Sequence, residues 1–376
     1  MRTTRTAPMI AVAAAFSLAL VACGSDAGDT AESAAGDTTD TEVEQVQEAG
    51  DEGAAVEQVD EPTGNGQLPT IAVTSNVLGD VVAAVVGESA EVVTIMPVGA
   101  DPHDFQASAQ DVLVMNTADA LIVNGAEFEE GLLDVIDAAG DEGVPTFEAI
   151  SAVGTIEFGE GGHDEHSDDD GHAHDDEHSD DEHSDEEHSD EEHDGHDHSG
   201  ADPHFFTDPM RMATAVDAIV DFLQTEVDFA DPAAVEAFAE AYVAELIALD
   251  GEVAELVQSI PEERRVLVTN HEVFGYFADR YGLEIIGAVI PGGSTTDGAS
   301  AGELAELAEQ IEAEGVPAIF ADTSSSDDLV EALAGEVGDI VVVELYSESL
   351  GEPGSDGATY VEMIRANATR MSSALA

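Results

Sequence analysis

The sequence predicts an α/β protein of two lobes, each a four-stranded, mainly parallel sheet flanked by helices, joined by one long rigid linker helix. Three observations support this fold class. After Leu68, short β-branched runs alternate with helical stretches, which is typical of βαβ units and parallel sheets. The runs form two groups of four. A single uninterrupted helical pattern separates the groups, so we expect two lobes of similar size.

The candidate strands are short apolar runs bounded by turn residues. In the first half they are Thr70 to Thr74, Val92 to Met96, Ala120 to Val123 and Val144 to Phe147. In the second half they are Val266 to Thr269, Glu284 to Val289, Ala318 to Phe320 and Asp339 to Leu345. Helical patterns such as Gly302 to Glu314 and Asp327 to Glu336 separate the strands of the second half. We place the N-terminal lobe at residues 68–230 and the C-terminal lobe at residues 261–376.

The linker helix is predicted over residues 231–260. Asp231 suits the N-cap, Pro232 suits the first helical position, and Pro261 ends the pattern. At a rise of 1.5 Å per residue this helix would be roughly 40 Å long, about the length of a lobe. We expect such a stiff connector to resist large hinge motion. An ordinary surface helix within a single domain is the alternative.

Residues 1–22 have the features of a signal peptide. Arg2 and Arg5 precede an apolar stretch from Met9 to Ala22 that is too short to span a bilayer as a mature helix. The following Leu-Val-Ala-Cys-Gly resembles the bacterial lipobox, in which the cysteine is acylated and becomes the new N-terminus. We expect a lipid anchor on Cys23 at the extracytoplasmic face of the cell membrane. A core cysteine is the alternative.

Residues 23–67 are predicted to form a disordered acidic tether. From Gly24 to Gln67 there are thirteen carboxylates and no basic residue, so the segment lacks the apolar area that would offset the entropy of ordering. Repulsion among the carboxylates would keep it extended and hold the folded part away from the membrane. An acidic interaction tail is the alternative.

The charge of the whole chain excludes one class of partner. Asp and Glu total 84 against eight basic residues, all Arg, which gives a formal net charge of -76. That charge opposes phosphate neutralisation, so DNA and RNA binding are excluded as primary functions. The single cysteine excludes an internal disulfide and any multi-thiolate metal site. His, Asp and Glu are the ligands that remain if a metal is bound.

Three histidines lie in segments of globular composition, and their positions suggest a shared site. His103 follows one predicted strand and His271 follows another. Ligands of open α/β sheets bind beyond the carboxyl ends of strands, so one histidine from each half would face a common cleft. His204 repeats the Asp-Pro-His triplet of His103, and each proline restricts the backbone before its imidazole.

A carboxylate at the end of the last strand would complete this site. Glu348 lies in the segment that follows Leu345. Three neutral imidazoles and one carboxylate would satisfy four-coordinate zinc and leave no open position. Asp322, which follows the strand at Phe320, is a second and less favoured candidate for the fourth ligand.

Several motifs together identify a family. They are Asp101-Pro102-His103 with Phe105 and Ser108, Asp202-Pro203-His204, and Asn270-His271 with Phe274-Gly275-Tyr276-Phe277 and Tyr281-Gly282. From roughly Leu68 to the C-terminus the chain resembles the solute-binding lipoproteins of zinc and manganese ABC importers. This resemblance implies two α/β lobes joined by a long helix, with metal clamped between them by residues matching His103, His204, His271 and a late acid. Glu348 matches the last position, where the family often has Asp.

A low-complexity loop, predicted over residues 159–200, separates the first two ligand positions. It contains ten histidines and nineteen acidic residues between positions 163 and 198. The histidines are His163, His166, His172, His174, His178, His183, His188, His193, His196 and His198. The segment is too polar to fold alone, and its imidazoles would bind zinc weakly and raise its local concentration. In the family such loops are associated with zinc rather than manganese importers. A merely solvated acidic run would not account for a histidine at every fifth residue.

The leading functional prediction is a monomeric, membrane-anchored protein that captures Zn²⁺ and delivers it to the transmembrane permease subunit of an ABC importer. The same architecture serving manganese (Mn²⁺) or iron is the first alternative, and an extracellular metal buffer or cell-adhesion protein is another. A zinc hydrolase is disfavoured because His271-Glu272 is not followed by a second histidine at the spacing of a His-Glu-x-x-His helix. A fourth protein ligand would also close the site to a reactive water. We therefore expect no enzymatic activity.

Overall fold

The computed structural model describes residues 68–158, 200–296, 298–338 and 340–376. The predicted signal peptide, the tether with Cys23, and the histidine-rich segment from His163 to His198 lie outside these residues. Within the described ranges, no helix is long and apolar enough to cross a membrane.

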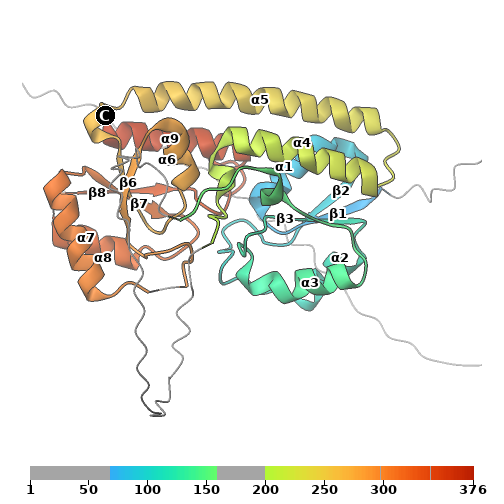
Figure 1. The fold of residues 1–376 in the computed structure, drawn as a ribbon, viewed down its shortest axis with the longest axis horizontal. Coiled ribbons are helices and arrows are strands. Elements are labelled where there is room, and N and C mark those ends of the chain that lie inside the picture. Colours follow the sequence, from blue (N-terminus) through green and yellow to red (C-terminus); the bar gives the residue numbers. More distant parts are fainter. Residues whose placement is uncertain (1–67, 159–199, 297, 339) are drawn as a thin grey trace, which may run out of the picture. The chain divides into compact units, whose positions relative to one another are not determined.

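The first lobe is built on a parallel sheet. Its strands are β1 (Thr70–Val73), β2 (Glu91–Thr94), β3 (Ala120–Val123) and β4 (Thr146–Glu148), in the order β2-β1-β3-β4. Every pairing is parallel, so the carboxyl ends of all four strands meet at one edge (Figure 1). The order places β1 in the centre, where its apolar residues are covered on both faces.

The second lobe repeats this design. Its strands are β5 (Val266–Thr269), β6 (Glu284–Ala288), β7 (Ala318–Asp322) and β8 (Val341–Leu345), in the order β6-β5-β7-β8 and again all parallel. The predicted fold class is confirmed. Each strand begins and ends within two residues of its predicted bounds. The apolar runs of the inner strands β1, β3, β5 and β7 are mostly buried, whereas the edge strands β2 and β8 are largely exposed or half-buried.

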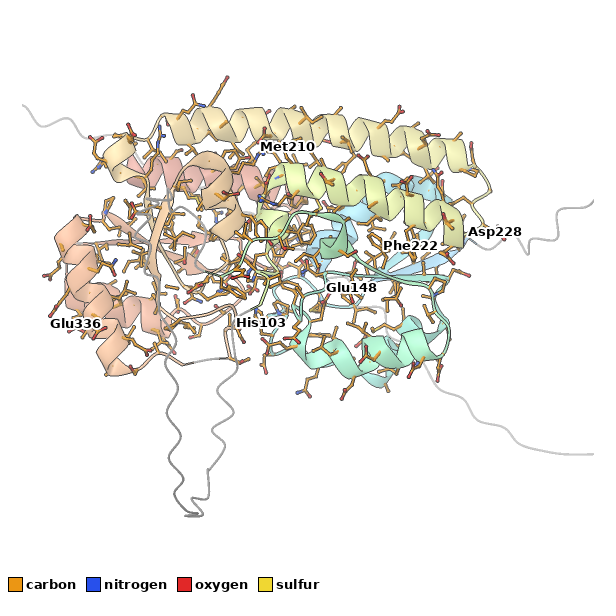
Figure 2. The ribbon with its side chains drawn as sticks, viewed as in Figure 1. His103, Glu148, Met210, Phe222, Asp228 and Glu336 are labelled. Atoms are coloured by element: carbon orange, nitrogen blue, oxygen red, sulfur yellow. The ribbon has the colours of Figure 1, made fainter. Side chains whose placement is uncertain are left out.

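Helices cover both faces of each sheet. The described α-helices other than the linker are α1 (Asn76–Val86), α2 (Ala109–Thr117), α3 (Leu133–Asp141), α4 (Pro209–Glu226), α6 (Gly275–Tyr281), α7 (Ala301–Glu314), α8 (Asp328–Val337) and α9 (Tyr360–Leu375). In the first lobe α1 and α4 lie on one face of the sheet, and α2 and α3 lie on the other (Figure 1). Alternating residues of β1 therefore enter different cores. Phe222 of α4, labelled in Figure 2, stacks on Phe147 of β4 with 5.1 Å between ring centroids.

The long helix α5 (Pro232–Gln258) is present and joins the lobes. The Asp231 side chain caps it by accepting a hydrogen bond from the Ala234 backbone N–H, and Pro232 occupies its first turn. One stripe of α5 is buried, at Val235, Ala239, Tyr242, Leu246, Leu249, Val253 and Val257. This stripe packs against α1 and α4 of the first lobe and against the C-terminal helix α9. The linker is therefore part of a core that runs through both lobes, which limits how freely they can move apart.

Candidate metal centre

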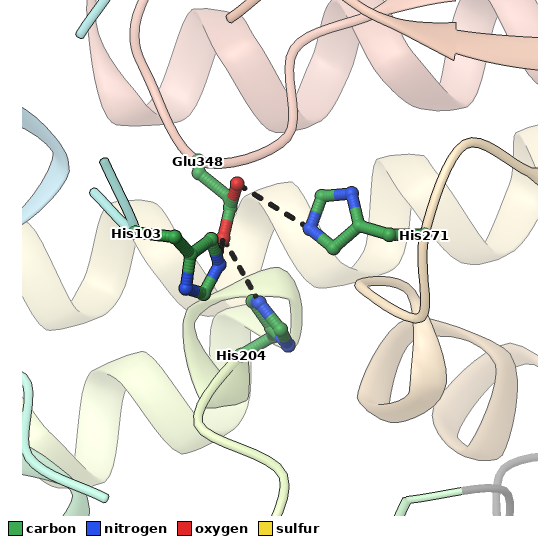
Figure 3. Close-up of side chains that lie close together, drawn as sticks. All are labelled: His103, His204, His271 and Glu348. Atoms are coloured by element: carbon green, nitrogen blue, oxygen red, sulfur yellow. Dashed lines mark hydrogen bonds and ion pairs between the residues drawn. The ribbon is translucent and has the colours of Figure 1, made fainter. Parts of the chain in front are cut away.

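Four buried side chains from distant parts of the chain meet between the two sheets. They are His103, His204, His271 and Glu348, and one ligand atom from each lies within 4.8 Å of the others. Three of them follow strands, since His103 comes after β2, His271 after β5 and Glu348 after β8. His204 lies directly before a short 3-10 turn that leads into α4. The structure thus brings together all four residues favoured from the sequence (Figure 3).

Glu348 occupies the centre of the group. Its Oε1 lies 2.7 Å from His103 Nε2 and 3.1 Å from His204 Nε2. Its Oε2 lies 3.3 Å from His271 Nε2. All three imidazoles therefore turn the same nitrogen toward one carboxylate, an arrangement that converges three nitrogens and an oxygen on a small volume (Figure 3).

The site is strongly coupled electrostatically. Burial lowers the pKa of His103, but the Glu348 and Glu130 carboxylates outweigh burial and raise that pKa to about 10. Burial also lowers the pKa of His204, whereas Asp202 and Glu348 raise it to about 9. Burial raises the pKa of Glu348, but the imidazoles of His271 and His103 hold it well below its ordinary value. A divalent ion would therefore bind this group by displacing protons.

Two of the four residues carry polar atoms with no hydrogen-bond partner among the described residues. These buried atoms are both ring nitrogens of His271 and Oε2 of Glu348, whose 3.3 Å contact with His271 Nε2 is an ion-pair contact without hydrogen-bond geometry. Burying such atoms without partners costs free energy, which a cation held between them would recover. The residues present therefore fit a metal ion in their charge, donor type and unsatisfied atoms.

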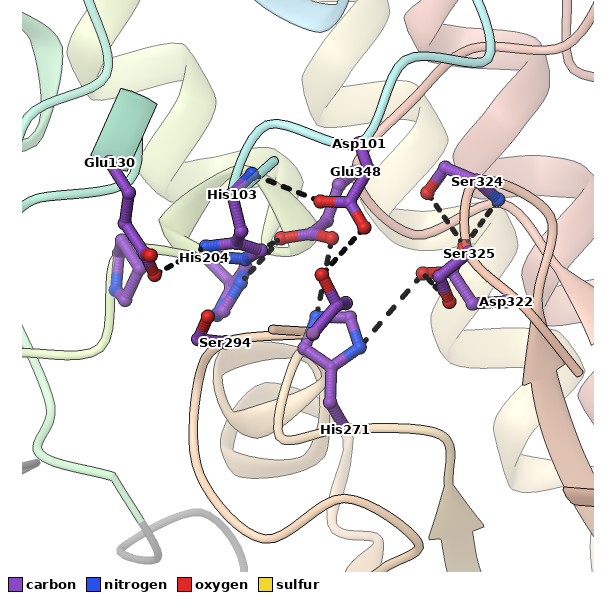
Figure 4. A network of polar contacts seen from close by, with 12 residues as sticks. Asp101, His103, Glu130, His204, His271, Ser294, Asp322, Ser324, Ser325 and Glu348 are labelled. Atoms are coloured by element: carbon purple, nitrogen blue, oxygen red, sulfur yellow. Dashed lines mark hydrogen bonds and ion pairs between the residues drawn. The ribbon is translucent and has the colours of Figure 1, made fainter. Parts of the chain in front are cut away.

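Carboxylates stand behind the imidazoles, and sequence reasoning did not assign them this place. His103 Nδ1–H donates to Glu130 Oε1 at 2.9 Å, and His204 Nδ1–H donates to Asp202 Oδ1 at 2.7 Å. Asp322 lies behind His271, with Oδ2 3.9 Å from Nδ1 (Figure 4). Asp322, the alternative fourth ligand, is thus on the far side of the ring from Glu348. The Asp-Pro-His triplet places Asp202 two residues before His204, so this pair could have been found from the sequence. The carboxylates behind the other two rings are distant in sequence and depend on the tertiary fold.

A buried carboxylate shapes the loop that carries Glu130. Glu129 is 1% exposed and accepts hydrogen bonds from Thr74 Oγ1 and from the backbone N–H groups of Asn124 and Gly125. Burial raises its pKa, although these hydrogen bonds partly oppose the shift. Phe128 in the same loop contacts the rings of His103 and His204 edge-on. The loop therefore forms one wall of the group.

Hydrogen bonds cross between the lobes around the site. Thr295 Oγ1, in the loop after β6, donates to Asp101 Oδ2 at 2.5 Å. Gly99 N–H donates to Ser349 Oγ at 2.7 Å, and Leu350 N–H donates to Asn76 Oδ1 at 2.7 Å. These contacts join the segments next to His103 and Glu348, so they hold together the two halves of the group formed by His103, His204, His271 and Glu348.

The chain is similar to known metal-binding proteins over most of its length. The chain matches the ZnuA family, described as "Zinc-uptake complex component A periplasmic", over residues 71–374. It is 29% identical over 324 residues to the zinc-binding protein TroA of Treponema pallidum, covering 82% of this chain and 89% of that protein. It is 25% identical over 310 residues to the manganese-binding lipoprotein MntA of Halalkalibacterium halodurans, covering 81% and 87%.

A solved structure shares the fold. The periplasmic zinc binding protein TroA from Treponema pallidum superposes with a TM-score of 0.68 at 27% identity, covering 82% of this chain and 99% of that one. The family resemblance predicted from the sequence motifs is therefore confirmed, while the relatives carry names of both zinc and manganese proteins. Members of the ZnuA family are the metal-binding, substrate-binding proteins of ABC importers and are not enzymes, and the chain belongs to this family.

Proposed function

We propose that this protein captures one Zn²⁺ ion through His103, His204, His271 and Glu348 and delivers it to the permease of an ABC importer. The observation that carries this proposal is the convergence of three imidazoles and one carboxylate in a buried group. Zinc binds such nitrogen and oxygen donors in four-coordinate sites without strong demands on geometry. The group supplies four protein ligands, so a bound zinc ion would have no open coordination position for a reacting water or another molecule.

The donor set favours zinc over manganese. Manganese sites are richer in oxygen ligands, whereas imidazole suits zinc well. Here three of the four donors are imidazole nitrogens. The nearby carboxylates Asp202 and Asp322 lie on the Nδ1 side of His204 and His271, away from the Nε2 atoms that would bind the ion. The names of the relatives do not separate the two metals, so the preference requires direct measurement.

Competition between the two metals tests this function. A variant lacking residues 159–199 removes the weak sites expected of the histidine-rich segment. We expect it to retain one zinc ion per chain after dialysis, and to exchange little of that zinc against an excess of manganese. Retention of manganese in preference to zinc would favour a manganese importer. Loss of both metals would argue against any tight site at this group.

We infer that the histidine-rich segment collects zinc near this site. Glu157 and Ala201, which flank the segment, form an antiparallel bridge, and Phe158 contacts the His204 ring at 6.3 Å between centroids. Both attachment points of residues 159–199 are therefore next to the ligand group. Titration should show one tight zinc ion and several weaker ones in the full chain. Deletion should remove only the weaker ions, and loss of the tightest binding would contradict this division of roles.

We further propose a lipid anchor on Cys23, with residues 23–67 as a tether, on the extracytoplasmic side of the membrane. The lipobox-like sequence around Cys23 supports it. Cys23→Ser should release a monomeric protein from membranes or leave it unprocessed. Recovery of the wild-type protein in the soluble fraction, without lipid, would contradict the anchor. A neighbouring permease and ATPase gene would favour import over an extracellular buffer or adhesin.

A further inference from the structure

The three imidazoles of the ligand group differ in how their outer nitrogen is held. For His103 and His204, Nδ1–H donates to a carboxylate at 2.9 Å and 2.7 Å respectively. Such hydrogen bonds fix the tautomer and orientation of a metal-binding imidazole, and they strengthen the nitrogen that faces the metal. His271 lacks this support, because its buried Nδ1 has no hydrogen-bond partner among the described residues.

Asp322 is the carboxylate in position to supply it. Its Oδ2 lies 3.9 Å from His271 Nδ1, about 1 Å longer than a typical N–H···O hydrogen bond of about 2.9 Å. Both side chains are buried, at 0% and 6% exposure for the whole residues. Nε2 of the same ring faces Glu348 at 3.3 Å, so Asp322 and Glu348 address different nitrogens of one imidazole (Figure 4).

The two oxygens of Asp322 are held unequally. Oδ1 accepts two short hydrogen bonds, at 2.8 Å each, from the backbone N–H and the hydroxyl of Ser324. Oδ2 accepts a longer one, at 3.3 Å, from Ser325 Oγ. The oxygen nearer to His271 is therefore the more weakly bonded of the pair and the easier to redirect.

A chain of contacts couples Asp322 to the backbone beside His271. Asn270 Nδ2–H donates to Ser325 Oγ at 2.7 Å, and that hydroxyl in turn donates to Asp322 Oδ2. Asn270 immediately precedes His271 in the loop after β5. The loop that carries His271 and the Asp322 carboxylate are thus tied together through Ser325.

From this asymmetry we propose that Asp322 is a positioning residue that accepts a hydrogen bond from His271 Nδ1–H when zinc binds at Nε2, completing a set of carboxylate-supported imidazoles. This inference rests on the proposed zinc site. It assigns Asp322 to the imidazole and not to the metal. In this proposal the outer hydrogen bond of His271 forms only when zinc binds, whereas those of His103 and His204 are already present.

Zinc affinity in the full-length chain tests the proposal. Competition with a tight chromophoric chelator reports only the strongest site. Asp322→Ala should weaken zinc binding about 10–100-fold, the usual effect of losing such a partner. Asp322→Asn keeps an acceptor oxygen and should recover part of the loss. Asp328→Asn removes the same charge from an exposed position near the start of α8 and should leave affinity unchanged.

Two further readouts separate positioning from other roles. Nitrogen NMR of imidazole-labelled protein should show His271 Nδ1 protonated and hydrogen-bonded in the zinc form of the wild type, and this signal should change in Asp322→Ala. Cobalt-substituted Asp322→Ala should keep the four-coordinate absorption of the wild type. A changed coordination number would make Asp322 a ligand, and unchanged affinity or a loss matched by lower stability of the metal-free protein would overturn the proposal. If the wild type itself bound no zinc tightly, the proposed function would fail instead.

Discussion

The two Asp-Pro-His triplets use the same backbone turn and different side-chain partners. In each, the aspartate Oδ1 accepts a hydrogen bond from the backbone N–H of the histidine two residues later, at 3.0 Å for Asp101 and 2.9 Å for Asp202. This is an Asx turn, and it presents the imidazole at the same point in each triplet. The triplet itself therefore determines where the backbone of the histidine lies.

The aspartates differ in what else they bind. Asp202 Oδ1 also accepts from the ring of its own histidine, so the orientation of His204 is secured within the triplet. His103 takes Glu130 as its outer partner, and Asp101 is left to accept a hydrogen bond from Thr295 of the second lobe. One triplet thus orients its imidazole locally, while the other also joins the lobes. A shared motif fixes a turn, but the tertiary fold decides the partners.

Removing either imidazole should have the largest effect. We expect His103→Ala and His204→Ala each to weaken zinc binding by more than about 100-fold, because each removes a nitrogen that binds the ion. Loss of only the outer hydrogen-bond partner of such an imidazole weakens binding by up to about 100-fold. Calorimetry on the protein lacking residues 159–199 measures this without interference from weak sites. Asp322→Ala should weaken zinc binding less than either histidine variant does. Unchanged binding in His103→Ala would show that the group is assigned wrongly.

Alanine variants of the two aspartates should differ in how strongly they change zinc affinity and the rate of zinc release. Asp202→Ala removes the ring support of His204 and should weaken zinc binding about 10–100-fold. Asp101→Ala removes both the Asx turn before His103 and a contact between the lobes, so beyond some loss of zinc affinity it should speed zinc release, by roughly tenfold for one charge-assisted hydrogen bond.

Thr295→Val is the matched control for the second variant. It removes the same inter-lobe hydrogen bond but leaves the Asx turn of Asp101 intact. Stopped-flow chelation of the zinc-loaded proteins measures the release rates. Equal effects of the two aspartate variants on both affinity and release would refute the difference drawn between the triplets.

Stability of the metal-free protein should depend on pH through both triplets. The pKa values of His103 and His204 are raised to about 10 and about 9, above the ordinary value of 6.5. Their contribution to stability is therefore fully present below pH 6.5 and is lost as pH rises through 9 and 10. Glu348, whose pKa is lowered, contributes above its ordinary value of 4.5 and loses that contribution only well below it.

Thermal unfolding between pH 6 and pH 10.5 measures this effect. The melting temperature of the metal-free wild type should fall across the alkaline part of the range more than that of the His103→Ala, His204→Ala double variant. Zinc displaces the same protons, so the rise in melting temperature caused by zinc should grow toward alkaline pH and vanish near pH 4. A zinc effect that persisted undiminished at pH 4 would argue for carboxylate rather than imidazole coordination.

The prolines should have the smallest effect. Pro102 and Pro203 are buried and precede the two histidines. Replacing either with Ala restores backbone freedom to the unfolded chain and should lower the free energy of unfolding by about 0.4–1 kcal/mol. Because the Asx turns remain, zinc affinity should change by only a few-fold. Chemical denaturation and chelator competition measure the two quantities, and a loss of affinity as large as that of Asp202→Ala would show that proline, not aspartate, positions the imidazole.

Much of this molecule was predictable from sequence because local patterns and burial agree. The β-branched run at Ala120–Val123 is a fully buried strand, and Asp231 with Pro232 begins the long helix as expected. His103 and His271 were predictable as neighbours because each follows a strand of its own lobe, and ligands of open α/β sheets bind beyond the carboxyl ends of strands. The inter-lobe contact of Thr295 and the roles of Glu130 and Asp322 were not, since they depend on how loops distant in sequence approach one another.

The coordination of bound zinc tests the central claim most directly. X-ray absorption spectroscopy of the full chain, loaded with one equivalent of zinc, reports the number and type of ligands. We predict three imidazole nitrogens at about 2.0–2.1 Å and a carboxylate oxygen, with one imidazole fewer in His204→Ala. A wild-type site with mainly oxygen ligands, or with fewer than three imidazoles, would contradict the assignment of His103, His204, His271 and Glu348 to a single ion.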